Sequence, residues 1–211
     1  MKYIAEFIGT FLLVAVVVGS GIMADNLSGG ISAIALLGNT IPTGAILYVI
    51  IKMFSPISGA HFNPVVSFVF FLRNELKLND LIKYIFIQII SGIFAVIIIH
   101  YIFQISIFQI STNIRGELPL LVSEIIATSG LVLTILLIKK NDENSVAIGV
   151  ALFIMAGYWF TSSTSFANPA VTIARVFTDT FTGIAPESFL YFLTGQIIGS
   201  VLAFKVYDLF K

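Results

Sequence analysis

Six apolar stretches of roughly 20 residues, separated by short polar segments, dominate this chain of 211 residues. A hydrocarbon core about 30 Å thick needs about 20 residues of helix to cross it, and a helix satisfies its own backbone hydrogen bonds there. The chain is 58% hydrophobic and only 10% charged, unlike an ordinary soluble domain. We therefore expect an all-α membrane protein whose six transmembrane helices lie near residues 3–24, 31–54, 81–104, 118–138, 145–160 and 187–209. The fifth stretch is short, and we expect it to continue through Ser163.

An Asn-Pro motif occurs twice, as Asn63-Pro64-Val65 and as Asn168-Pro169-Ala170. Each copy follows a small, polar stretch without helical character and precedes a short apolar run. Asn is a favoured helix N-cap and Pro is favoured in the first turn, so each motif begins a helix. Neither helix is long enough to cross a bilayer. Two half-helices that start inside the membrane, in matching halves of a chain, are typical of a transport site.

The two halves of the chain resemble each other weakly. The similar pairs are residues 5–10 with 123–128, and residues 88–92 with 196–200. We expect a single transmembrane domain, 1–211, made of two repeats at about residues 1–104 and 118–211. Because each repeat has three spans, an odd number, the repeats insert in opposite orientations about a pseudo-two-fold axis in the membrane plane. The two half-helices then enter from opposite faces and meet at mid-membrane.

The charged residues predict the orientation, although the net charge is zero. Most of the 11 Lys and Arg residues fall at cytoplasmic ends if the N-terminus is inside. These are Lys2, Lys52, Arg73, Lys77, Lys83, Lys139, Lys140, Lys205 and Lys211. Only Arg115 and Arg175 remain on the other side. Cytoplasmic loops carry an excess of Lys and Arg, so we expect a multi-pass protein of the inner cell membrane with both termini in the cytoplasm.

With these motifs, the chain resembles the major intrinsic proteins, the family of aquaporins and aquaglyceroporins. The resemblance covers all six spans and rests on the paired Asn-Pro-Val and Asn-Pro-Ala motifs, with Ser58-Gly59-Ala60-His61 before the first. It implies two inverted repeats with two re-entrant half-helices. It also implies a homotetramer in the lipid bilayer, in which each protomer has its own pore.

The residues around the two motifs predict how such a pore works. Non-helical backbone at membrane depth is tolerated where it lines water, so residues 58–62 and 163–167 should present carbonyl oxygens to the solute. Asn63 and Asn168 cap the half-helices with their side-chain oxygens, and we expect their NH2 groups to donate into the lumen. A single-file water must then turn its oxygen toward both amides, which interrupts proton hopping. We expect an uncharged cargo, because two helix N-termini repel cations.

Two glutamates, Glu6 and Glu124, lie at matching positions within apolar spans. An ionisable group is costly there and is a functional candidate. A proton relay would suit a coupled transporter, whereas matched positions in two repeats favour carboxylates that accept N–H groups from the re-entrant loops. We favour loop support. We place His61 at the cytoplasmic entrance of the pore, either as a brace for the loop or as a contact for the solute.

The resemblance places the narrow outer filter, by spacing from the motifs, at Thr43, Ala156, Ser165 and Val171. Typical members have an arginine where this chain has Val171, and a bulky aromatic residue where it has Thr43. Because a filter arginine is an electrostatic barrier in aquaporin-type pores, its absence predicts a wide, uncharged filter. The segment 168–175 resembles a bacterial branch of the family, with Val in place of this arginine, that is associated with arsenic-resistance clusters. That resemblance implies trivalent arsenic hydroxide among the solutes.

Arg175 follows Val171 by one helical turn and shares a face with Asn168. With a rise of about 1.5 Å per residue, it lies about 10 Å outward from Asn168 along the half-helix. It is therefore better placed to line the outer mouth of the pore than to form its constriction. Burial against Asp179 is the alternative, and the sequence supports both equally.

Three functions compete at this stage. We favour a passive channel for water and small neutral solutes, such as glycerol-like polyols and arsenite, over a strict water channel. An ion-coupled secondary transporter is less favoured, because only the two glutamates could couple ions at the midplane. We do not expect an enzyme, because the chain has no cysteine, no metal-ligand cluster, no nucleophile–base pair and no cofactor motif. We likewise expect no cofactor, no resident metal and no nucleic-acid partner.

Overall fold

A computed structural model describes residues 1–210, so Lys211 of the topology prediction lies outside the described residues. The described chain forms α1 (Lys2–Leu27), α2 (Ser32–Ser58), α3 (Pro64–Leu72), α4 (Leu78–Ile102), α5 (Leu118–Asn141), α6 (Val146–Phe160), α7 (Pro169–Val176) and α8 (Pro186–Tyr207), with 3₁₀ turns at Glu143–Ser145 and Asp208–Phe210. Six helical segments are long and apolar enough to cross a membrane, namely α1, α2, α4, α5, α8 and α6 with its preceding turn. The prediction of an all-α protein with six spans is confirmed.

The fifth span differs from its prediction at one end. Helix α6 stops at Phe160, because Thr161 has an extended backbone (φ −109°, ψ 135°). The span instead gains length at its start, where the turn Glu143–Ser145 brings it to 18 residues. Ser163 lies in the non-helical segment that follows, and its N–H donates to Ser123 Oγ at 3.0 Å. The prediction that the span continues through Ser163 is wrong.

Both half-helices begin as the Asn-Pro motifs predict. Asn63 has an extended backbone, and its side-chain oxygen accepts the N–H of Val65 at 3.1 Å. Asn168 caps α7 in the same way and accepts the N–H of Ala170 at 2.9 Å. Helix α3 has nine residues and α7 has eight. At about 1.5 Å per residue, each reaches roughly halfway across a membrane.

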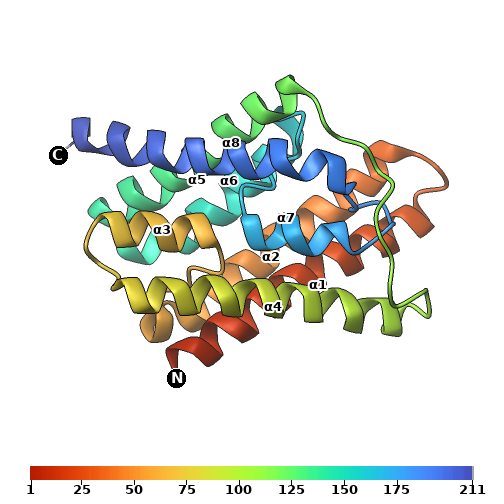
Figure 1. Cartoon of the computed structure of the whole chain (residues 1–211), viewed down its shortest axis with the longest axis horizontal. Coiled ribbons are helices and arrows are strands. Elements are labelled where there is room, and N and C mark those ends of the chain that lie inside the picture. Colours follow the sequence, from red (N-terminus) through yellow and green to blue (C-terminus); the bar gives the residue numbers. More distant parts are fainter. Residues whose placement is uncertain (211) are drawn as a thin grey trace.

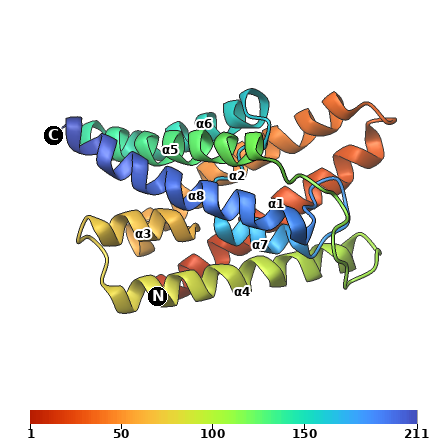
Figure 2. The same ribbon diagram turned by 45° about the horizontal axis from the view of Figure 1, so that its top comes forward.

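The half-helices lie between two long helices at the centre of the molecule. Figures 1 and 2 show α3 and α7 arranged end to end between α4 and α8. Helix α4 contacts both half-helices, and so does α8. The remaining contacts repeat between the halves, because α1 packs on α2 and α4 while α5 packs on α6 and α8. This pattern is that of two inverted repeats joined across the half-helices.

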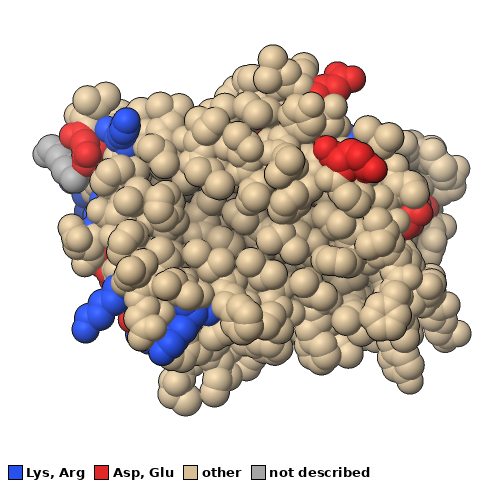
Figure 3. All heavy atoms as spheres, in the orientation of Figure 1, with Lys and Arg blue, Asp and Glu red and all other residues tan. Residues whose placement is uncertain are grey.

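The surface fits a membrane-spanning protein. The two termini lie at the same end of the long axis (Figures 1 and 2). On the face drawn in Figure 3, charged side chains gather near the two ends and leave a broad uncharged band between them. Large apolar side chains are exposed along the long helices, among them Ile41, Phe86, Ile126, Leu152 and Leu202. Such a surface is stable against lipid rather than water.

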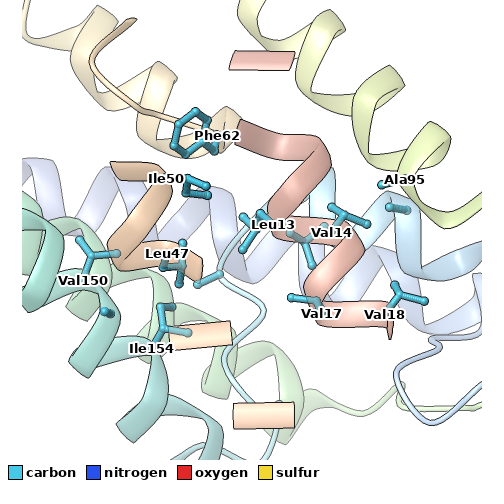
Figure 4. Packing of buried hydrophobic residues seen from close by; sticks show 14 of the residues in the cluster. Leu13, Val14, Val17, Val18, Leu47, Ile50, Phe62, Ala95, Val150 and Ile154 are labelled. Atoms are coloured by element: carbon cyan, nitrogen blue, oxygen red, sulfur yellow. The ribbon is translucent and has the colours of Figure 1, made fainter. Parts of the chain in front are cut away.

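The buried core joins α1, α2 and α6 to the first re-entrant loop. Figure 4 shows Leu13, Leu47 and Ile154 facing one another, with the ring of Phe62 near the same cluster. Gly9 lets α1 approach this ring closely, because a Cβ atom at that position would lie 2.0 Å from a Phe62 ring carbon. The core therefore positions the loop that carries the first Asn-Pro motif.

Candidate functional site

A cavity of about 570 Å³ runs along the inside of the helix bundle. Its walls come from α1, α2, α5 and α6 and from both re-entrant loops. At one end it is lined by Lys52 and Lys139, which lie toward the termini, and at the other it reaches Arg175. Between these ends it passes Asn63 and Asn168. The asparagines of both motifs therefore line one cavity.

The two loops share an unusual backbone. The positive φ angles fall at the same three positions before each Asn: 86°, 53° and 47° at Gly59, Ala60 and Phe62, and 60°, 49° and 47° at Thr164, Ser165 and Ala167. A residue other than glycine in this left-handed region costs roughly 1–2 kcal/mol. Such a conformation persists only where surrounding contacts hold it in place. The matching angles also show that the two repeats have the same local backbone.

Glu6 provides those contacts for the first loop. One of its carboxylate oxygens accepts Ser58 Oγ at 2.7 Å and the N–H of His61 at 3.0 Å. The other accepts the N–H of Phe62 at 2.7 Å and Gln88 Nε2 at 2.8 Å. The carboxylate is fully buried and does not line the cavity.

Glu124 holds the second loop in the matching way. Its carboxylate accepts the N–H groups of Phe166 at 3.0 Å and Ala167 at 2.8 Å. Gln196 Nε2 donates to it at 2.7 Å. Glu124 is also fully buried and is absent from the cavity wall. The geometry of both glutamates is that of loop support, and neither is placed to pass protons along the cavity.

Two glutamines that we did not predict as site residues complete these networks. Gln88 Nε2 also contacts Ser67 Oγ at 3.2 Å, and Gln196 Nε2 also contacts Thr172 Oγ1 at 2.8 Å. Each glutamine therefore ties the glutamate of its repeat to the half-helix. The signal was present in the sequence, because both amides occupy matching positions inside apolar spans.

The two asparagines bind each other's loops. Asn63 Nδ2 donates to the carbonyl oxygen of Ala167 at 2.7 Å, and Asn168 Nδ2 donates to that of Phe62 at 2.8 Å. The prediction that the NH2 groups simply point into the lumen is therefore incomplete. One N–H of each amide joins the loops, which leaves the second N–H of each for the cavity that both residues line.

The carbonyl oxygens that remain available are fewer than predicted. The carbonyl of Ser58 accepts Tyr84 Oη at 2.9 Å, and that of Ser163 accepts Thr164 Oγ1 at 2.6 Å. The carbonyls of Phe62 and Ala167 accept the asparagine amides. Among residues 1–210, no protein donor reaches the carbonyls of residues 59–61 or 164–166. Residues 59–61 of the first loop and residues 165–166 of the second also line the cavity, so their carbonyls are the acceptors available to a solute.

Three of the four residues predicted for the filter line the cavity, and one does not. Thr43, Ser165 and Val171 line the cavity. Ala156 is exposed on the outer face of α6, whereas Tyr158 is buried, lines the cavity and donates its hydroxyl to Thr43 Oγ1 at 3.3 Å. Two residues along a helix correspond to about 200° of rotation, so the two side chains lie on opposite faces. The prediction that Ala156 faces the pore is wrong, and a phenol occupies space that we expected to be open.

His61 lines the cavity and also packs against the first half-helix and its neighbours. Its Nδ1 lies 3.0 Å from Ser67 Oγ. Its ring packs on Phe70 at 4.6 Å and on Tyr84 at 5.4 Å between ring centroids. The contacts brace the loop, and one edge of the ring remains beside the path.

A charged group lies at the same end of the cavity as the termini. Glu75 accepts Arg73 Nε at 2.6 Å and Lys139 Nζ at 3.2 Å. Partial burial acts to raise the pKa of Glu75, but the hydrogen bonds from these two cations outweigh it and hold the pKa below its usual range. Lys139 also lines the cavity and lies 4.7 Å above the Phe70 ring, which packs on His61.

Arg175 is buried beside the cavity and not against Asp179. The carboxylate of Asp179 instead accepts the N–H of Thr112 at 2.8 Å and its hydroxyl at 3.0 Å. Arg175 Nε donates to the carbonyl of Thr182, and its guanidinium carbon lies 3.5 Å from the centre of the Phe166 ring. Of the two alternatives, burial against Asp179 is excluded.

Comparison with known proteins agrees with this geometry. A family model described as "Major intrinsic protein" matches residues 1–145. Aquaglyceroporin AqpS of Rhizobium meliloti (strain 1021) is 46% identical over 96% of this chain and 86% of its own length. The chain belongs to the major intrinsic protein family. A probable TIP-type aquaporin of Medicago truncatula is 30% identical over 97% of this chain and 84% of its own length.

A solved member of this family shares the fold. The X-ray structure of the aquaglyceroporin from Plasmodium falciparum matches with a TM-score of 0.79 and 22% sequence identity. The match covers 98% of this chain and 94% of the other. The fold of six spans and two half-helices is therefore that of an aquaglyceroporin structure.

The carboxylate networks predict an order of severity for substitutions. Glu6→Gln retains one acceptor for the loop, whereas Glu6→Ala leaves buried donors unpaired at roughly 1–3 kcal/mol each. We expect water permeability in proteoliposomes, and the thermal unfolding midpoint in detergent, to fall slightly for Gln and strongly for Ala. The same order should hold for Glu124.

Glu187 provides the control for these variants. It is an exposed carboxylate in the first turn of α8, and Glu187→Ala should change neither measurement. If Gln and Ala abolish flux equally in protein that assembles normally, the carboxylates have an ionisable role and loop support is not their main function.

Proposed function

We propose that this chain is a passive transmembrane channel for water and small neutral solutes that excludes ions and protons. Glycerol-like polyols and metalloid hydroxides such as arsenite are the solutes that we expect besides water. One observation carries the proposal: a single cavity is lined by both cross-bonded asparagines and by residues 59–61 and 165–166, whose carbonyls have no protein donor within residues 1–210. Such a path offers a solute hydrogen-bond donors and acceptors but no fixed anionic group at its centre.

Electrostatics at the centre of the path supports an uncharged cargo. The half-helices begin at Asn63 and Asn168, whose side chains reach each other's loops, so the two helix N-termini lie close together. Each N-terminus carries about half a positive charge. At about 5 Å and an effective dielectric of about 20, the pair repels a cation by on the order of 3 kcal/mol. Loss of hydration adds to this for an ion, whereas a neutral solute keeps its hydrogen bonds.

A secondary transporter fits the site less well. Ion coupling at the midplane needs side chains that can bind and release the ion. Glu6 and Glu124 accept hydrogen bonds from their own loops on both oxygens and lie outside the cavity wall. A strict water channel remains the closer alternative. The name of the aquaglyceroporin AqpS, at 46% identity, supports the wider range of solutes.

The filter that we propose consists of Thr43, Tyr158, Ser165 and Val171. Its small members support passage of solutes larger than water, and Tyr158 narrows it relative to our prediction from the sequence. Val171 in place of the usual arginine supports a place in the bacterial branch of the family that is associated with arsenic-resistance clusters.

We also propose the assembly and the orientation. The family relationship and the exposed apolar helix faces support a homotetramer with one pore per protomer. The single domain would consist of repeats at about residues 1–104 and 118–211. Termini at one end of the molecule, together with the distribution of Lys and Arg, support an inner-membrane protein with both termini in the cytoplasm.

Purified protein in vesicles should dissipate gradients of water, glycerol and arsenite without moving charge. The physical reason is that no step strips an ion of water and binds it again. Osmotic swelling at one protein density, recorded together with membrane current, is the measurement. Current or proton uptake that scales with protein would contradict the channel proposal, and passage of water alone would identify a strict water channel.

A matched pair of variants connects this flux to the cavity. Ser165→Trp places a large side chain in the cavity and should abolish flux. Ala156→Trp adds the same side chain to the exposed face of α6 and should leave flux unchanged.

The filter proposal predicts the effect of Val171→Arg. The guanidinium adds volume to the filter and, at about 5 Å and a dielectric of about 20, on the order of 3 kcal/mol of cation repulsion. We expect glycerol and arsenite permeability to fall about tenfold relative to water, which corresponds to about 1.4 kcal/mol of barrier. Val171→Leu, which adds volume without charge, is the control. An unchanged ratio in a well-expressed Val171→Arg protein would show that position 171 does not line the narrowest point.

A further inference from the structure

Arg175 is a buried cation without a carboxylate partner among the residues that the structure describes. Its side chain is 4% exposed, and the ion pairs of the described chain do not include it. Glu124 instead accepts loop N–H groups and Asp179 accepts Thr112, so neither carboxylate pairs with Arg175. A buried charge normally has a partner, so this one needs a functional reason.

The unused donors of Arg175 face the cavity. A guanidinium has five N–H donors, and among the described residues Nε alone has a protein acceptor, the carbonyl of Thr182. No protein acceptor within residues 1–210 reaches Nη1 or Nη2, and neither atom is sealed from solvent. Because Arg175 lines the cavity, these four N–H groups are available to whatever passes through it.

The position of the guanidinium is fixed by the second re-entrant loop. Its carbon lies 3.5 Å from the centre of the Phe166 ring, which packs on Phe192 at 4.6 Å. The backbone N–H of Phe166 is one of the groups that Glu124 holds. A planar guanidinium stacked on an aromatic face keeps its orientation better than an ammonium would.

Other polar groups line the same end of the cavity. Ser165 Oγ is buried and has no hydrogen-bond partner within residues 1–210, and the Tyr158 hydroxyl lies beside Thr43. Both residues line the cavity with Arg175. Because Ser165 Oγ is sealed from solvent, it does not serve a solute directly, and the free donors at this end of the cavity are the Nη groups of Arg175.

We propose that Arg175 is a specificity-determining residue of the outer filter, and that it supplies there the guanidinium that position 171 lacks. The inference rests on the proposed channel function and deepens it. Arg175 lies one helical turn further along α7 than the arginine of typical family members. Its side chain packs over Phe166, which lines the cavity. The filter is then charged, and its cationic group repels cations while its Nη groups donate to hydroxyl oxygens of water and neutral solutes.

Arg115 is a natural control, because it packs on the same ring with different donors. Its guanidinium carbon lies 5.3 Å from the centre of the Phe166 ring. Its Nη atoms contact Thr164 Oγ1 at 3.5 Å and the carbonyl of Ser162 at 3.3 Å, and it does not line the cavity. It shares the charge and the ring of Arg175 but not the access to the solute.

The absence of cysteine from this chain permits a direct test. Arg175→Cys introduces a single thiol, which can be modified with a cationic methanethiosulfonate (aminoethyl) or a neutral one (methyl) in proteoliposomes. Loss of a charge at about 5 Å, at a dielectric of about 20, should raise sodium permeability about a hundredfold. We expect the cationic reagent to reverse most of this leak and the neutral reagent not to do so. In Arg115→Cys, the sodium permeability should rise by less than about tenfold relative to the unsubstituted protein.

Several outcomes would overturn the proposal. They are an Arg175→Cys protein that conducts water and excludes sodium as before, a leak that both reagents reverse equally, and an equal leak in Arg115→Cys. If Arg175→Cys does not assemble, the double variant Val171→Arg/Arg175→Met tests the proposal, because it returns the guanidinium to the usual family position. That protein should exclude sodium, and a leak equal to that of Arg175→Met would contradict the proposal. Failure of the unsubstituted protein to pass water or glycerol would instead refute the channel function itself.

Discussion

Two buried carboxylates hold non-helical backbone inside the membrane, and the rest of the structure depends on them. A peptide N–H without a partner at this depth costs several kcal/mol, and lipid cannot supply one. Glu6 and Glu124 accept the N–H groups that point away from the cavity, two from each loop. The carbonyls of residues 59–61 and 165–166 are thereby left for the path. The loop carbonyls can line the pore because the two buried glutamates bind the loop N–H groups on the side away from the cavity.

The two repeats use one scheme but finish the pore differently. Both loops have positive φ angles at the same positions, and in both a glutamine joins the glutamate to the half-helix. They differ two residues before the Asn, where the first loop has His61 and the second has Phe166. The ring of His61 packs against neighbouring rings at one end of the cavity, whereas the ring of Phe166 packs against the guanidinium of Arg175 at the other. Symmetry sets the centre of the path, and these two residues give its ends different chemistry.

Features fixed by local chemistry could be predicted from the sequence. Span length identified the six helices, the Asn-Pro motifs identified the half-helices, and matched glutamates identified the loop supports. Ala156 was misplaced, because counting back from Asn168 crosses non-helical residues whose length does not determine which face of α6 meets the pore. The asparagine donors and the guanidinium of Arg175 depend on contacts between distant segments. No spacing in the sequence could show that Asn63 donates to the carbonyl of Ala167, or that Arg175 packs on Phe166 and not against Asp179.

The central claim is that the glutamates support the loops from behind while the loop carbonyls and asparagine amides face a continuous file of water. The most direct test is a crystal structure of the protein in a lipid phase, at a resolution that shows ordered water. We predict a row of waters in contact with the carbonyls of residues 59–61 and 165–166 and with Nδ2 of Asn63 and Asn168, and none in contact with either carboxylate. Water or an ion bound to Glu6 or Glu124, or a gap in the row at the asparagines, would contradict the account.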